Sequence, residues 1–72
     1  MSEANDRYVQ YILRRIDEDE YPSHELMQRV EFALASRDQV AAYLEVLFDK
    51  VDSCHYPSRF ILDRIARFAP MV

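Results

Sequence analysis

The chain has 72 residues, of which half are apolar and 31% are charged, and its formal net charge is −4. These values are typical of one small globular domain, and the acidic balance argues against binding to phosphate backbones, which requires a positive field. The absence of glycine argues against phosphate-binding loops and dinucleotide-binding fingerprints, because both depend on this residue.

Three features of the sequence predict a cytoplasmic protein. The one cysteine, Cys54, excludes a disulfide within the chain and fits a reducing compartment. No apolar run reaches the roughly 18 residues of a membrane-spanning helix. The N-terminal residues 1–6 are polar and acidic, and therefore do not resemble a secretion signal.

The chain contains an internal repeat. The segment Tyr21-Pro22-Ser23 returns as Tyr56-Pro57-Ser58, which is 56 − 21 = 35 residues later, and this offset aligns residues 8–34 with residues 43–69. Six of the 27 aligned pairs are identical. Apolar positions also coincide, in the pairs Val9/Leu44, Ile12/Leu47, Leu13/Phe48, Ile16/Val51, Leu26/Ile61, Met27/Leu62 and Val30/Ile65. The sequence therefore predicts an all-α protein built from two copies of one helical hairpin.

The domain organisation follows from this repeat. Residues 1–72 are expected to form a single helical domain, with residues 1–5 as a frayed N-terminus. Repeat 1 covers about residues 6–35 and repeat 2 covers about residues 36–70. The two tandem helix-turn-helix hairpins share one core and make a compact four-helix domain.

The first helix is expected over about residues 6–17, where apolar residues follow the i, i+3, i+4, i+7 spacing of a buried face. The acidic run 17–20 then opposes the helix dipole, and Pro22 makes further helix costly. We interpret the run as a solvated turn. The second helix is expected over about residues 24–35, with Ser23 as its N-cap and an ion pair between Glu25 and Arg29.

The third helix is expected over about residues 37–52, after the capping-box pattern of Ser36 and Gln39. Its inner stripe contains Val40, Leu44, Leu47 and Val51, with Gln39 among the polar residues of the other side. The fourth helix is expected over about residues 59–69, with Ser58 as a cap equivalent to Ser23. Its inward residues are predicted to be Ile61, Leu62, Ile65, Phe68 and Ala69.

Metal or redox chemistry is one alternative function. If both Tyr-Pro-Ser turns lie at one end of the domain, that end also collects His24, Cys54, His55 and the acidic run 17–20, which are ligand types that zinc accepts. Cys54 and His55 are adjacent, however, and neighbouring residues rarely bind one ion. We predict no metal, no cofactor and no catalytic residue, because so small a core can hardly bury a carboxylate enough to shift its pKa. No small-molecule substrate is evident.

Regulation of a nucleic acid, or of an enzyme that acts on one, is a second alternative. The last helix carries Arg59, Arg64 and Arg67 with Asp63, which is a local charge of 3 − 1 = +2. Arg64 lies off the line that joins the other two arginines, so the patch is diffuse. The acidic balance elsewhere argues against this function.

The preferred function is a small non-catalytic protein–protein interaction domain, of an adaptor or regulatory kind, that forms a homodimer or binds a protein partner. The first and third helices are apolar over more of their circumference than one small core needs, and the excess falls at repeat-matched positions. The predicted partner-binding residues are Tyr8, Tyr11 and Arg15 in the first helix and Tyr43, Val46 and Lys50 in the third. In the other interpretation, this side of each helix packs against the neighbouring hairpin.

Overall fold

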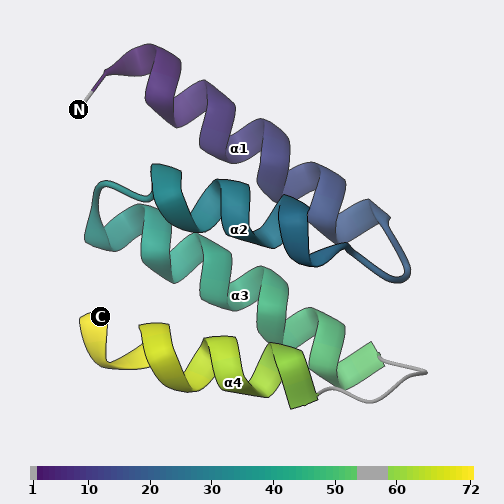
Figure 1. The fold of residues 1–72 in the computed structure, drawn as a ribbon. Coiled ribbons are helices and arrows are strands. Elements are labelled where there is room, and N and C mark those ends of the chain that lie inside the picture. The colour runs from purple at the N-terminus through teal and green to yellow at the C-terminus, as the bar shows by residue number, and fades with distance from the viewer. Residues whose placement is uncertain (1, 54–58) are drawn as a thin grey trace.

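The computed structural model describes residues 2–53 and 59–72, and these residues form four α-helices and one short 3₁₀ helix (Figure 1). The helices are α1 (Glu3–Glu18), α2 (His24–Ala33), α3 (Arg37–Ser53), α4 (Arg59–Phe68) and η1 (Ala69–Met71). The described residues contain no strand, which confirms the all-α prediction. Within the same residues, no helix combines the length and the apolar character needed to cross a bilayer.

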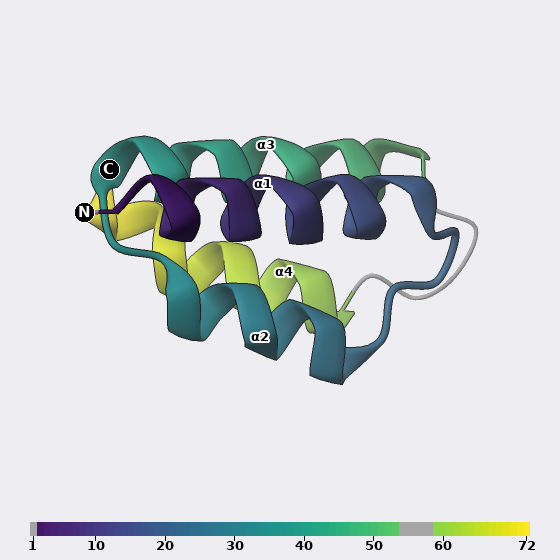
Figure 2. The ribbon, with the colours of Figure 1, turned by 90° about the horizontal axis from the view of Figure 1, so that it is seen from above.

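The helices are arranged in two layers, with α1 and α3 side by side in one layer and α2 and α4 in the other (Figure 2). Helix α1 packs against α2 as one hairpin, and α3 packs against α4 as the second. The contact between α1 and α3 joins the hairpins. Both termini lie at the end of the molecule where α1 and α3 begin (Figure 2).

The first helix begins earlier than the sequence pattern predicts. Ser2 is its N-cap, and the Ser2 hydroxyl oxygen accepts a hydrogen bond from the Asn5 backbone N–H at 2.9 Å. Glu3 and Asp6 place negative charge in the first turn, where the helix dipole favours it. The prediction of a frayed segment over residues 1–5 is therefore wrong for residues 3–5, which are helical because a serine cap precedes them.

Two local predictions for the second helix are confirmed. The Ser23 hydroxyl oxygen accepts a hydrogen bond from the Leu26 backbone N–H at 3.0 Å, so Ser23 is the N-cap of α2. On the surface of the same helix, Arg29 and Glu25 form an ion pair at 3.5 Å. The equivalent cap, Ser58, lies outside the described residues.

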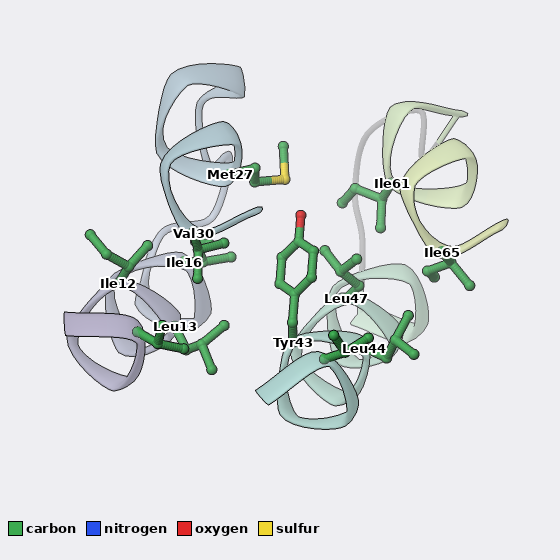
Figure 3. Packing of buried hydrophobic residues seen from close by; sticks show 12 residues of the cluster. Ile12, Leu13, Ile16, Met27, Val30, Tyr43, Leu44, Leu47, Ile61 and Ile65 are labelled. Carbon is green, nitrogen blue, oxygen red and sulfur yellow. The ribbon is translucent and has the colours of Figure 1, made fainter. Parts of the chain in front are cut away.

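All four helices contribute side chains to one apolar core (Figure 3). Tyr43 is fully buried and rises from α3 into the space between α2 and α4 (Figure 3). Its ring meets the Phe68 ring edge-on, with 5.6 Å between the centroids. The buried apolar residues are Val9, Ile12, Leu13, Ile16, Met27, Val30, Val40, Tyr43, Leu44, Leu47, Ile61 and Ile65.

Hydrogen bonds from polar side chains link α1 to α3 at both ends of the contact between these helices. At one end the Gln39 amide nitrogen donates to Asn5 Oδ1 at 2.8 Å and to Asp6 Oδ1 at 2.5 Å, while its oxygen accepts from the Ala35 backbone N–H. At the other end Lys50 Nζ donates to the Asp17 backbone carbonyl oxygen at 2.7 Å. Gln39 is buried rather than on the outer polar side as predicted, because its amide forms hydrogen bonds with the Asn5 and Asp6 side chains of α1 and with the Ala35 backbone N–H.

Candidate functional site

The structure places the two halves of the predicted partner-binding stripe in different environments. The half on α1, which consists of Tyr8, Tyr11 and Arg15, is exposed. The half on α3, which consists of Tyr43, Val46 and Lys50, faces α1 and the interior. The six residues therefore do not form one continuous surface, although the sequence repeat makes them equivalent in pairs.

We call the exposed half, Tyr8, Tyr11 and Arg15, the α1 edge. Tyr11 is 54% exposed, and its hydroxyl oxygen accepts a hydrogen bond from the Arg15 guanidinium at 3.3 Å. This hydrogen bond is the main reason why the pKa of Arg15 lies above its usual value. The α1 edge continues onto α2, where a hydrogen bond to Tyr8 is the largest cause of a raised pKa of Arg29. The surface thus presents tyrosine rings held beside guanidinium groups.

On α3, Tyr43 is buried between α2 and α4, and Val46 and Lys50 are half-buried, which corrects the prediction that this half is available to a partner. Tyr43 is 0% exposed, Val46 packs against the core, and Lys50 binds backbone carbonyl oxygens of Asp17 and Asp19. The physical reason is that other helices pack against this side of α3, whereas no helix among the described residues covers the corresponding side of α1. The alternative interpretation from the sequence, packing against the neighbouring hairpin, therefore holds for α3 and fails for α1.

A buried charge cluster, which was not predicted from the sequence, bridges α2 and α4. The Glu31 carboxylate on α2 accepts hydrogen bonds from the Tyr43 hydroxyl at 2.5 Å and from the Arg64 guanidinium on α4. The Glu31 and Arg64 side chains are only 10% and 8% exposed. The more exposed Arg67 adds a second ion pair to Glu31 at 3.5 Å. The cluster therefore adds ion pairs between α2 and α4 to the apolar core that both helices share.

Arg64 was predicted to belong to a diffuse basic patch, but it lies inside the protein. Its position in the sequence contains the signal: Arg64 falls within the apolar stripe of Ile61, Ile65 and Phe68 on one face of α4. An arginine at such a position needs a buried anion, because an unpaired buried charge is costly. The patch on α4 is therefore reduced to Arg59 and Arg67.

The chemistry of the cluster is that of a structural bridge, although the buried Nε of Arg64 has no hydrogen-bond partner among the described residues. Burial, followed by the hydrogen bond to Glu31, raises the pKa of Tyr43 far above its usual value, so the phenol stays neutral and cannot act as a base. The Arg64 guanidinium also contacts His24 Nδ1 at 2.6 Å. Because arginine can only donate, Nδ1 accepts this hydrogen bond. The His24 ring also meets the Phe60 ring edge-on, with 4.8 Å between the centroids.

A shallow groove of about 250 Å³ lies where α1 and α3 begin, with Asp6, Gln10 and Gln39 in its lining. It is smaller than the roughly 300–1,000 Å³ of ordinary small-molecule pockets. The described residues hold no group of three or more His, Cys, Asp or Glu side chains that could bind a metal ion. Cys54 and His55 lie outside these residues.

Comparison of the chain with protein-family models, with curated proteins and with solved structures finds no significant match.

Proposed function

We propose that this chain is a small protein–protein interaction domain and that the α1 edge is its contact surface. One observation carries the proposal: Tyr8, Tyr11 and Arg15 are exposed on α1, whereas the equivalent residues of α3 are covered by a neighbouring helix. The same pattern of residues is therefore used for helix–helix packing once within the chain. Tyrosine and arginine are also enriched where protein surfaces associate.

The energetics of the α1 edge favour a protein partner. Tyrosine loses little conformational entropy on binding and combines a large apolar ring with a polar hydroxyl. The hydrogen bond between Tyr11 and Arg15 holds both side chains in place before binding, which reduces the ordering cost. A nucleic-acid function has less support, because the burial of Arg64 removes one of the three arginines from α4.

Site-specific photo-crosslinking in cells tests this proposal. A photoreactive amino acid at position 11 should give a discrete crosslinked product, because a partner would cover the α1 edge. The control is the same amino acid at position 28, where Gln28 is exposed on α2 outside this surface. A product of equal yield from both positions, or no product from position 11, would refute the proposed contact surface.

A further inference from the structure

The outer side of α3 exposes apolar residues whose equivalents in the first hairpin are buried. Leu13 of α1 faces α3 and is 7% exposed, whereas its equivalent Phe48 is 47% exposed. Met27 of α2 is 3% exposed, whereas its equivalent Leu62 on α4 is 50% exposed. The first hairpin packs against the second hairpin through this side, whereas no helix among the described residues covers the equivalent side of the second hairpin.

We call this second free surface the α3 edge, and it consists of Ala41, Phe48 and Asp52 on α3 together with Leu62 on α4. All four residues are exposed. They are equivalent to Asp6, Leu13, Asp17 and Met27 of the first hairpin. The α1 edge, in turn, is equivalent to the covered side of α3. The two hairpins contact each other through one side of α1 and one side of α3. The repeat equivalents of these two sides are the α3 edge and the α1 edge, and both are exposed.

Resting on the proposed function, we propose that the partner of the α1 edge is the α3 edge of a second copy of this chain. The two copies would stack in the geometry that joins α1 to α3 within one copy (Figure 2). The argument is continuity with the internal interface: each free edge is the repeat equivalent of a side that is buried there.

The residue pairs that such stacking creates are complementary in the middle of the contact. Tyr11 takes the place of Val46 and meets Phe48 of the second copy, which takes the place of Leu13. This arrangement buries two apolar groups that are otherwise half exposed. Arg15 takes the place of Lys50, which binds the carbonyl oxygens at the end of α1. Asp52 of the second copy is the equivalent of Asp17, so Arg15 meets a residue of that same type and of opposite charge.

Other positions make this contact weaker than the internal one. Arg29 takes the place of Arg64, but Ala66 of the second copy stands where Glu31 accepts the buried arginine. Ala4 likewise takes the place of Gln39, so the hydrogen bonds from the Gln39 amide that link α3 to α1 are not reproduced. Stacking between copies therefore lacks both buried polar links of the internal interface, and we expect it to be reversible.

The two edges are different surfaces, so the association is head-to-tail and each complex keeps one free edge at either end. Such a contact does not close at a dimer. The average mass of the wild-type protein should therefore rise continuously with concentration, as measured by sedimentation equilibrium. A mass that levels off at twice the monomer would overturn the head-to-tail arrangement, as would a monomer at all concentrations.

Two complementary variants give a sharper test. Tyr11→Glu blocks the α1 edge and Phe48→Glu blocks the α3 edge, because a charge is costly in a dry contact. Each variant alone should be a monomer, and an equimolar mixture should show an average mass approaching twice that of the monomer, since each partner supplies the intact edge that the other lacks. Gln28→Glu is the control, because Gln28 is exposed on α2 outside both edges, and this variant should associate like wild type.

The possible outcomes separate this inference from the proposed function. If Phe48→Glu alone still forms a dimer, the contact is symmetric and the head-to-tail proposal is overturned, while the α1 edge remains an interaction surface. If the wild type is a monomer but position 11 crosslinks to another protein, the second copy is excluded as partner. If position 11 gives no crosslink and the wild type is a monomer, both proposals fail. Helicity of each variant, measured by circular dichroism, shows that the loss of association is not unfolding.

Discussion

Substitution of Arg64 by methionine should show how much the buried charge cluster contributes to the free energy of unfolding. Methionine keeps the apolar stem of the side chain but leaves the Glu31 carboxylate without its main cation. Removing one partner of a buried ion pair costs about 3–5 kcal/mol. Glu31 retains the Tyr43 hydroxyl and the ion pair with the half-exposed Arg67, so we expect the lower limit, about 3 kcal/mol.

The size of this loss can be compared with the stability of the whole domain. At about 0.05–0.15 kcal/mol per residue, a chain of this length has a free energy of unfolding of about 4–11 kcal/mol. Arg64→Met should therefore remain folded but unfold at a much lower urea concentration, as measured by far-ultraviolet circular dichroism. The double variant Glu31→Leu with Arg64→Met should recover most of the loss, because a buried ion pair and an apolar replacement are often of similar stability.

The internal repeat supplies a matched control for this experiment. Arg29 is the repeat equivalent of Arg64, is exposed, and pairs with Glu25 on the helix surface. Arg29→Met should therefore leave the urea midpoint nearly unchanged. Equal effects of the two substitutions would refute the assignment of Arg64 to the interior. A double variant that is less stable than Arg64→Met alone would refute the view that the stranded carboxylate causes the loss.

Three further results are expected. Because burial raises the pKa of Tyr43 from its usual 10.0, the folded protein keeps a proton that the unfolded chain releases, so the free energy of unfolding should fall as the pH rises above 10.0. Urea titrations should show a shallower fall for Tyr43→Phe, and an identical slope would contradict the burial of the phenol. Ser23→Ala should lower the free energy of unfolding by about 1 kcal/mol through loss of the α2 cap, whereas an unchanged melting temperature would mean that the hydroxyl does not stabilise the helix. Chelator treatment should leave the melting temperature unchanged if Cys54 binds no structural metal, and a loss of helicity would restore the metal hypothesis.

The helices and their inward faces could be predicted because they depend on local spacing. Apolar residues such as Val9, Ile12 and Ile16 recur at helical intervals, and all three are buried. The N-cap at Ser23 follows from the hydrogen-bonding needs of the first helical turn, which tertiary packing rarely overrides. Prediction from such signals requires only the neighbours of a residue along the chain.

The burial of each helix side depends instead on which helix lies next to it. Repeat-equivalent residues can therefore differ in burial although the sequence pattern around them is the same. Tyr8 and Tyr43 are identical and equivalent, yet Tyr8 is exposed and Tyr43 is fully buried, because within the described residues the second hairpin has a neighbour on that side and the first hairpin has none. The same asymmetry, in the opposite direction, exposes Leu62, which the sequence pattern placed in the core. The burial of such a side chain depends on the position of its hairpin in the stack, and a local sequence pattern does not contain this information.

The place where α4 ends determines whether gene duplication could add a further hairpin to a fold of this kind. Helix α4 finishes at the end of the molecule where α1 and α3 begin (Figure 2), just as α2 finishes there before the turn into α3. A third hairpin could therefore follow η1 without a long crossover, and it would lie against Phe48. The topology of two stacked hairpins therefore does not limit the number of hairpins. The side chains on the outer faces determine whether further hairpins are added within one polypeptide or by association of separate chains.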